Sequence, residues 1–417
     1  MKKILIEGGS PLFGEVHISG AKNSVLPLIA ATLLTDGTSV IDDCPWLSDV
    51  DTMCRVLAHL GARPYFERNT LAIDTSGLNN TDPPAELMRQ MRASFLIMGP
   101  MLARVGKIRL ALPGGCAIGA RPIDLHLKGF EALGASITLG HGYVEAQAKQ
   151  LCGNRIYLDF PSVGATENLI MAGALAEGTT IIDNAAHEPE IIDLSNMLNA
   201  MGAKIKGAGT NTIRIEGVTS LKAARHTVIP DRIEAASFLA MAAATGGELI
   251  LNNVISEHLQ PLTAKLIESG VFMEIGYDSI HILGNKDIDP VDIKTLPYPG
   301  FPTDAQAQFM ALLTVARGTS VITETVFENR FMHAAELAKM GADITIDGNA
   351  ATVNGVSRLH AAQVRATDLR GGAAMIIAAQ MAHGVTEISE IHHIERGYED
   401  YVGKLEAIGT RIKIVED

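Results

Sequence analysis

The chain has 417 residues, a formal net charge of −13, and a composition that is 47% hydrophobic and 19% charged. At roughly 150 residues per domain, this length favours two or three domains with sizeable cores. The apolar content excludes a disordered chain, and every apolar stretch ends before the ~18 residues of a membrane span. The negative charge argues against a nucleic-acid partner. The apolar run at residues 4–6 is too short for a signal peptide, so we expect a cytoplasmic protein that uses no membrane.

The four cysteines lie at positions 44, 54, 116 and 152. Their spacing fits neither a structural zinc site nor a disulfide scaffold, which is typical of a reducing compartment. The chain also lacks the lysine-containing phosphate loop, the GxGxxG fingerprint and a histidine-rich metal spacing. We therefore expect no metal site.

A helical apolar pattern that ends in glycine and continues into a short β-type run occurs six times. An Ala-rich helical pattern followed by an alternating strand precedes each copy. The chain is therefore predicted to consist of six repeats of roughly 70 residues, each in the order strand, helix, strand, helix, strand, strand. The glycines that end the second helices are Gly61, Gly134, Gly202, Gly270, Gly341 and Gly409.

The repeats are predicted to form two domains of three repeats each, because a single repeat buries too little surface. The sixth repeat lacks a closing strand, whereas the third repeat closes with residues 213–217, which residues 4–8 nearly copy. We therefore predict one domain at residues 21–229 and a discontinuous domain at 1–20 plus 230–417, closed by the N-terminal strand. The two chain crossings between these domains allow a hinge.

The first helix of each repeat is predicted to begin with polar residues. Helix N-termini carry free N–H groups and partial positive charge, so related helix starts that point the same way attract anions. Helix capping accounts equally well for the three aspartates at these starts. A cation at a helix start opposes the dipole and therefore favours a bound anion. The residues at the six starts are Lys22-Asn23, Arg92, Thr166-Glu167, Asp231-Arg232, Asp304, and Asp368 with Arg370.

Residues 113–122 carry three glycines between a predicted strand and a predicted helix that Pro122 would open. Such a loop is expected to be mobile and to expose Cys116. A nearby cation, Arg121 and as a second candidate Arg92, can lower the pKa of this thiol from its usual ~8.5 and make it reactive.

Several segments resemble the bacterial UDP-N-acetylglucosamine 1-carboxyvinyltransferase family, enolpyruvyl transferases that open peptidoglycan synthesis. The resemblance spans the chain and is most specific in the cysteine loop and in FPTDAQAQF. It implies an α/β (α+β) fold of two domains, each an inside-out α/β barrel of three repeats. The sister 5-enolpyruvylshikimate 3-phosphate synthases are expected to share this fold without the cysteine loop. The segments are GAKNSVLP, PGGCAIGARPIDLH, SVGATENL, EPEI, FPTDAQAQFMALL, ETVFENRFMH, ATDLRGGA and HIERGYED.

The resemblance implies two substrates, phosphoenolpyruvate and UDP-N-acetylglucosamine. The sugar 3′-hydroxyl would add to C2 of phosphoenolpyruvate with protonation at C3, and the tetrahedral intermediate would then lose phosphate. No metal or organic cofactor is needed for this reaction. The oligomeric state stays open.

The resemblance also implies roles for individual residues. Cys116 would donate the proton and be alkylated by fosfomycin, and Asp304 would accept the proton of the sugar hydroxyl. Domain closure would bring Cys116 inward, with Asp368, Arg370 and Glu188 stabilising the closed cleft. The phosphoenolpyruvate anion would be bound by Lys22, Arg121 and Arg396, with Asn23, Arg92 and Arg330 in support. The uridine diphosphate and sugar would contact Arg121, Pro122, Ile123, Asp124, Leu125, Ser162, Val163, Gly164, Asp304 and Val326.

Two departures from the family pattern affect the nucleotide side, where some members carry Trp and Lys and this chain has Leu96 and Phe160. Two rival hypotheses stay open. A non-catalytic paralogue that binds a nucleotide sugar should lose some of the reacting residues, all of which are present. An enolpyruvyl transferase for another acceptor has no reason to keep the nucleotide loop at residues 121–125.

Overall fold

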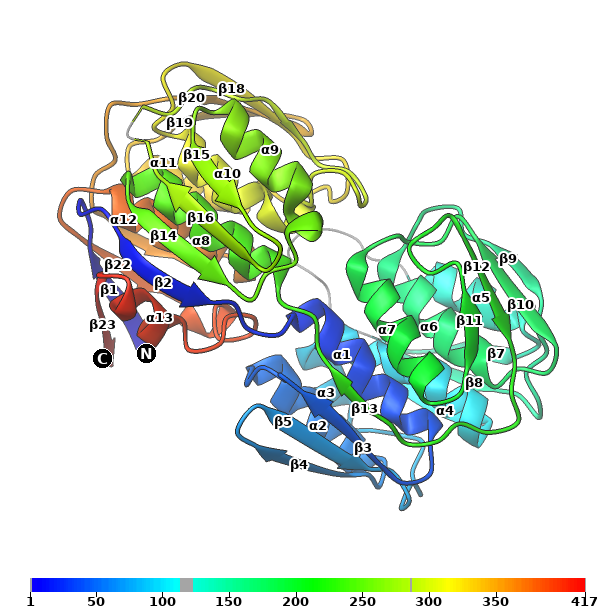
Figure 1. Cartoon of the computed structure of the whole chain (residues 1–417). Helices are drawn as coiled ribbons and strands as arrows, with labels where there is room; N and C mark the ends of the chain where they lie inside the picture. Colours follow the sequence, from blue (N-terminus) through cyan, green and yellow to red (C-terminus); the bar gives the residue numbers. More distant parts are fainter. Residues whose placement is uncertain (1, 113–122, 286, 417) are drawn as a thin grey trace. The chain divides into compact units, whose positions relative to one another are not determined.

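The computed structural model describes residues 2–112, 123–285 and 287–416, which divide into two compact domains (Figure 1). Residues 20–112 and 123–229 form the N-terminal domain, and residues 2–19 with the described part of 230–416 form the C-terminal domain. The candidate residues Cys116, Arg121 and Pro122 lie outside the described residues.

In the C-terminal domain, three four-stranded sheets share one pairing pattern, in which the first two strands are parallel and the others antiparallel. One sheet joins β2 (Phe13–His17), β14 (Glu248–Asn252), β16 (Ser279–Leu283) and β15 (Phe272–Ile275). The next joins β17 (Ile293–Lys294), β18 (Thr319–Thr323), β20 (Ala350–Asn354) and β19 (Asp343–Asp347). The last joins β21 (Gln363–Arg365), β22 (Val385–Ser389), β1 (Lys2–Glu7) and β23 (Arg411–Glu416).

The N-terminal domain repeats the same pattern in two of its sheets. The first joins β13 (Arg225–Thr227), β3 (Thr38–Asp42), β5 (Thr70–Asp74) and β4 (Arg63–Glu67). Another joins β9 (Arg155–Tyr157), β10 (Thr179–Asp183), β12 (Thr212–Glu216) and β11 (Lys204–Lys206). The third, over the described residues, has three antiparallel strands, β6 (Lys107–Ala111), β8 (Tyr143–Gln147) and β7 (Ser136–Gly140).

Strands contributed from distant parts of the sequence complete three of these sheets. β1 lies between β22 and β23, with Ile4 opposite both Ile388 and Ile414, so the N-terminus supplies the strand that the sixth repeat lacks. β2 pairs with β14 in the fourth repeat, whereas β13 pairs with β3 in the first. At each crossing, near the predicted residues 21 and 229, the chain therefore leaves a strand of one domain and enters a helix of the other. The pairings of β2 and β13 were not predicted from the sequence.

The first helix of each repeat is buried on nearly all sides, which requires a helix that is apolar all round. In the C-terminal domain, α8, α10 and α12 also pack against one another. With these helices inside and the sheets outside, the predicted α/β fold class is confirmed (Figure 1). The central helices are α1 (Lys22–Ala31), α4 (Met98–Val105), α6 (Val163–Ala174), α8 (Arg232–Thr245), α10 (Gln306–Leu313) and α12 (Leu369–Met381).

The second helix of each repeat ends before one of the six repeat glycines, whose φ angles run from 86° to 105°. Glycine adopts this left-handed conformation most readily because it has no Cβ atom, so the predicted C-terminal caps are confirmed. None of the helices in the described part of the chain is both long and apolar enough to cross a membrane. The second helices are α2 (Ser48–His59), α5 (Asp124–Ala132), α7 (Pro189–Ala200), α9 (Gln260–Glu268), α11 (Met332–Lys339) and α13 (Tyr401–Ala407). The remaining helical segments are η1 (Thr32–Leu34), α3 (Ala85–Gln90), η2 (Arg92–Ile97), η3 (Ser256–Leu259), η4 (Thr303–Ala305) and η5 (Ile391–His393).

In four repeats a glycine directly follows the strand that closes the repeat, which is β12, β20, β16 or β1. This glycine touches the backbone near the C-terminal end of the central helix. A Cβ atom at Gly217 would lie 1.6 Å from the Ala176 carbonyl oxygen, and one at Gly355 would lie 1.6 Å from the Ala316 carbonyl oxygen. No side chain fits at such a distance, so these glycines are required for sheet and helix to approach. The other two positions of this kind are Gly8 and Gly284.

We expect Gly217→Ala to lower the free energy of unfolding by about 3 kcal/mol, because the backbone must move to admit the methyl group. Urea unfolding followed by circular dichroism measures the loss. The matched control is Gly348→Asn, at φ 59° with open space around it, where a change of only about 0.5 kcal/mol is expected. Equal losses in the two variants would contradict this interpretation.

Candidate functional site

In the N-terminal domain, cations stand at helix starts as predicted. Lys22 opens α1 and Arg92 opens η2, which leads into α4. The Lys22 ammonium lies 2.8 Å from the Asp49 carboxylate in the first turn of α2, and both side chains are largely buried. A buried charge is retained where it is paired, so Asp49 compensates the cation at the helix start. Sequence reasoning missed Asp49, since an acid in a first turn is equally well explained by the helix dipole.

A second buried carboxylate, Asp193 on α7, fixes the residues that follow Lys22 and Asn23. It accepts a hydrogen bond from the Ser24 hydroxyl, lies 2.7 Å from His226 Nε2, and accepts a 3.4 Å bond from the Ile229 N–H. One side chain thus ties the start of α1 to α7 and to the segment after β13.

The two segments expected to bind the nucleotide meet at His126. Its Nδ1 lies 3.0 Å from the Asn168 amide of α6, and its ring packs edge-on against Phe95 at 5.2 Å. A Cβ atom on Gly164 would lie 3.4 Å from His126 Cε1. Burial, and then the Arg92 charge, lowers the pKa of His126 to about 4, so the imidazole is neutral near pH 7. Ile123, Asp124 and Leu125 lie directly before His126, where α5 begins.

The start of α6 differs from the sequence expectation. The helix begins at Val163, three residues before Thr166, because the Ser162 hydroxyl caps it by accepting from the Ala165 N–H. Thr166 and Glu167 are consequently buried inside the helix. Burial, together with Glu190 and Glu188, raises the pKa of Glu167 well above its ordinary value, so this carboxyl is not a helix-start anion.

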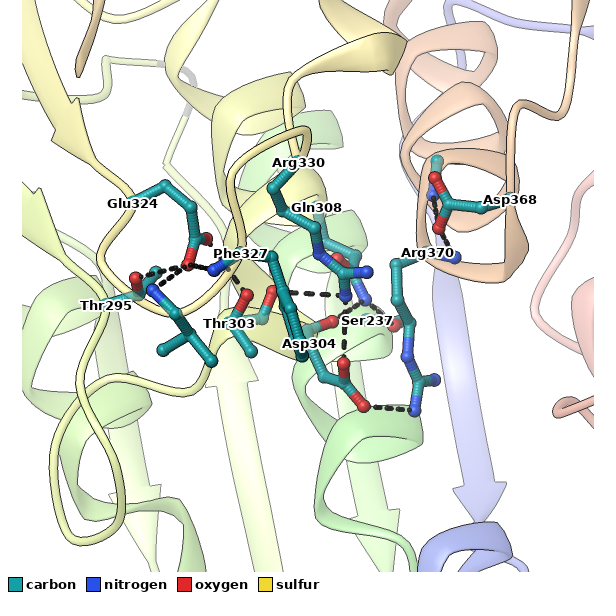
Figure 2. A network of polar contacts seen from close by, with 12 residues as sticks. Ser237, Thr295, Thr303, Asp304, Gln308, Glu324, Phe327, Arg330, Asp368 and Arg370 are labelled. Carbon is teal, nitrogen blue, oxygen red and sulfur yellow. Dashed lines mark hydrogen bonds and ion pairs between the residues drawn. The ribbon is translucent and has the colours of Figure 1, made fainter. Parts of the chain in front are cut away.

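In the C-terminal domain, the Asp304 carboxylate lies between two buried guanidinium groups (Figure 2). Arg330 Nη2 donates to Asp304 Oδ1 at 2.8 Å, and Arg370 Nη2 donates to Oδ2 at 3.0 Å. The arginine side chains are 4% and 3% exposed, whereas that of Asp304 is 26% exposed and can be reached from outside.

The capping interpretation is confirmed for Asp231 and Asp368, whereas Asp304 has the first-turn position that this interpretation allows but has two arginines as its side-chain partners. Asp231 accepts from two backbone N–H groups of α8, and Asp368 accepts from the N–H groups of Arg370 and Gly371 in α12. Asp304 instead sits inside a turn of 3₁₀ helix and neutralises the two arginines. Local sequence could not distinguish these cases, because Arg330 lies 26 residues away in the same repeat and Arg370 lies in the next repeat.

A buried polar network continues from Asp304 between α8, α10 and α12. Gln308 Nε2 donates to the Asp304 carbonyl at 2.9 Å and to the Ser237 hydroxyl at 3.3 Å, and Ser237 lies 2.7 Å from the Tyr398 hydroxyl. Within the described residues, Gln308 Oε1, Arg330 Nε and Arg370 Nη1 are buried without a partner. Unpartnered buried polar atoms are costly, and a polar ligand at this site would reduce that cost.

The remaining candidates lie in the same domain. The Val326 N–H donates to Glu324 Oε1 at 2.8 Å. Arg396 follows η5, and burial, His392 and Arg396 together lower the pKa of His393. Over the described ranges, no group of three His, Cys, Asp or Glu side chains is placed to hold a metal ion.

The two departures from the family pattern have different environments. Leu96 is 6% exposed and belongs to the core of the N-terminal domain. Phe160 is 45% exposed, so its ring is accessible from solvent.

The family model described as EPSP synthase (3-phosphoshikimate 1-carboxyvinyltransferase) matches residues 6–405. UDP-N-acetylglucosamine 1-carboxyvinyltransferase 2 of Carboxydothermus hydrogenoformans is 58% identical over 419 residues, covering all of both chains. UDP-N-acetylglucosamine 1-carboxyvinyltransferase 1 of Caldanaerobacter subterraneus subsp. tengcongensis is 57% identical over 98% of this chain and 99% of that relative. The chain belongs to the UDP-N-acetylglucosamine 1-carboxyvinyltransferase family. The resemblance inferred from sequence motifs is thereby confirmed.

Solved structures support the same fold. The enolpyruvyl transferase NikO from Streptomyces tendae superposes with a TM-score of 0.91 at 26% identity, covering 99% of each chain. An EPSP synthase from Acinetobacter baumannii superposes with a TM-score of 0.77 at 19% identity over the whole of both chains, which shows the shared fold alone.

Acid should destabilise the C-terminal domain through His333, which is 1% exposed on α11. Burial lowers its pKa to about 4, although Asp368 opposes the shift. Below the unfolded value of about 6.5, the unfolded chain binds a proton that the folded chain cannot, so stability falls as pH drops. We expect a loss of about 2 kcal/mol from this group at pH 5 relative to neutral pH.

Urea unfolding at pH 5 and pH 7, compared between the wild type and His333→Leu, measures this contribution. The variant should lose less stability on acidification, whereas an unchanged pH dependence would show that folding does not lower the pKa of His333.

Proposed function

We propose that this chain transfers the enolpyruvyl group of phosphoenolpyruvate to the 3′-hydroxyl of UDP-N-acetylglucosamine, releasing phosphate, in the cytoplasm. The observation that carries the proposal is the full-length identity of 57–58% to two relatives named for this activity. The reaction would be the first committed step of peptidoglycan synthesis. It needs no metal or organic cofactor.

The proposed chemistry balances with the two substrates alone. The sugar oxygen forms a bond to C2 of phosphoenolpyruvate and gives its proton to Asp304, while Cys116 gives a proton to C3. The resulting tetrahedral intermediate carries a carboxylate and a phosphate. A proton then returns from C3 to the protein and restores the Cys116 thiol, while the bond from C2 to the phosphate oxygen breaks and the proton held by Asp304 leaves with the phosphate. The products are the enolpyruvyl ether and free phosphate.

The surroundings of Asp304 suit a base. Arg330 and Arg370 stabilise its ionised form by charge-assisted hydrogen bonds, and only an ionised carboxylate can accept a proton. Its partial exposure leaves room for the sugar hydroxyl at the carboxylate. Arg370 and Asp368 would act on the substrate side mainly by fixing the start of α12 and, through it, Asp304.

Cations account for the recognition of two anionic substrates. Lys22, Arg396 and Arg121 would bind phosphoenolpyruvate, with Asn23 and Arg92 in support. The partial positive charge at the N-terminal end of α1 favours the same anion. The nucleotide sugar would contact Arg121, Pro122, Ile123, Asp124, Leu125, Ser162, Val163, Gly164 and Val326.

Phosphate release from phosphoenolpyruvate tests the proposal directly. We expect release that depends on UDP-N-acetylglucosamine, that fosfomycin abolishes in the wild type, and that is lost or strongly reduced in Cys116→Ala. Phosphate release only with another acceptor would show that the chain is an enolpyruvyl transferase for that acceptor. A folded protein that releases no phosphate with the nucleotide sugar would favour a binding paralogue.

Asp304→Asn should lower kcat by about 10²- to 10⁴-fold, because the amide cannot accept the hydroxyl proton. Steady-state kinetics with both substrates measure the effect. The matched control is Asp347→Asn on the exposed face of β19, which should leave kcat unchanged. A wild-type kcat in the Asp304→Asn variant would show that Asp304 does not accept the hydroxyl proton.

A further inference from the structure

The six repeats provide internal controls for one another, and the fifth departs from four of the others after its second strand. In four repeats the residue that follows this strand has a left-handed backbone: Asp43, Asn184, Asn253 and Glu390, with φ from 51° to 60°. In two of these, the asparagine side chain donates to a carbonyl after the first strand, Asn184 to Leu158 and Asn253 to Ile18. Glu324 occupies this place after β18, and its φ is not positive.

A second departure occurs after the first strand of the same repeat. The residue that follows the first strand donates its N–H to the carbonyl of the last residue of the second strand. In the fifth repeat this residue is Thr295, which is fully buried. A buried hydroxyl at this place requires a partner that the other repeats do not need. Its counterparts are all apolar and buried, namely Ile18, Leu158, Val228 and Ala366.

The two departures bond to each other. The Thr295 hydroxyl donates to Glu324 Oε1 at 2.8 Å, while the neighbouring Thr325 hydroxyl donates to the Thr295 carbonyl, the bond that asparagine makes elsewhere. In the fifth repeat Thr325 therefore makes the hydrogen bond that joins the ends of the first and second strands. The Glu324 carboxylate accepts hydrogen bonds from other segments instead.

Those contacts reach both segments that shape the candidate site (Figure 2). The Thr303 hydroxyl donates to Glu324 Oε2 at 2.9 Å, directly beside Asp304. The N–H groups of Val326 and Phe327 donate to Oε1 at 2.8 and 3.2 Å, at the start of the segment that leads to Arg330.

The segment that carries Asp304 needs such an anchor. The connection from Thr295 to Thr303 is longer than its counterparts, for example from Leu158 to Val163. A longer connection has more conformational freedom to lose, and here the Leu296 N–H donates to the Phe301 carbonyl at 3.0 Å, which leaves the two residues before Asp304 to be held by other contacts. Glu324 supplies a fixed point at that end.

We propose that Glu324 is a positioning residue for the acceptor side of the reaction, holding Asp304 in register with Val326 and Arg330. The inference rests on the proposed function. Burying a carboxylate is costly unless it is fully hydrogen-bonded, and Glu324 is 2% exposed. Four other repeats close the same turn with a left-handed residue, so the fold itself does not require this buried charge.

Thr303→Val tests the bond to the Asp304 segment with little change in volume. We expect kcat to fall about 10- to 100-fold through misplacement of the base, with KM for phosphoenolpyruvate changed less than about twofold. The melting temperature should stay within about 2 °C of the wild type. The matched control is Thr319→Val, which removes an exposed hydroxyl bonded to Asn354 on the same sheet and should leave kcat unchanged.

Glu324→Gln and Glu324→Ala test the carboxylate itself. The glutamine keeps an oxygen for the Val326 and Phe327 N–H groups and an amide that can donate to Thr303, so it should retain more kcat than the alanine. A positioning role predicts this partial rescue among folded variants.

Wild-type kcat in both Thr303→Val and Glu324→Gln would overturn the proposal. A fall in kcat that is accompanied by a clear loss of affinity for phosphoenolpyruvate and a clear fall in melting temperature would also overturn it, since this would indicate a purely structural role. If the wild type released no phosphate with UDP-N-acetylglucosamine, the proposed function would be contradicted, and this inference, which rests on it, would fail as well.

Discussion

The central helices have almost no polar face, and this constraint decides where chemistry can occur. A helix surrounded by other elements must be apolar along most of its length, so most of its charged side chains lie near its ends, and the few polar ones inside it need hydrogen-bond partners. At the N-terminal end the unsatisfied N–H groups add a preference for negative charge. The candidate residues Lys22, Asp304 and Arg370 all lie at or beside such ends.

The buried charges at these ends are compensated in pairs. Asp49 lies against Lys22 in the N-terminal domain, and Asp304 lies against Arg330 and Arg370 in the C-terminal domain. A buried charge without such a partner would be strongly destabilising, whereas a paired one preserves a cation or carboxylate for an anionic or hydroxyl-bearing substrate. The same pairing that makes these residues compatible with folding therefore keeps them ionised for the proposed reaction.

Repetition separates the residues that the scaffold needs from those that the site needs. Glycines after the last strands recur because each sheet meets the end of its central helix in the same way. Thr295 and Glu324 do not recur, and they bond to each other and to the segments around Asp304. Such a paired exception costs buried polar surface in one repeat only, which is why we assign it to function.

The sequence by itself determined the repeats, the glycine-capped C-terminal ends of the second helices and the family. Left-handed glycines such as Gly61 and Gly341 act through their own backbone, and motif residues need no tertiary information to be read. Only the tertiary structure decided that Ser162 rather than Thr166 sets the start of α6, that Asp304 neutralises two arginines instead of capping, and that Asp49 pairs with Lys22. Each of these depends on the immediate environment of a side chain, and in the last two its partners lie far away in the chain. Sequence periodicity reports which face of a segment is buried, whereas the partner of a buried charge is set by how separate elements pack, within one repeat for Asp49 and Arg330 and between repeats for Arg370.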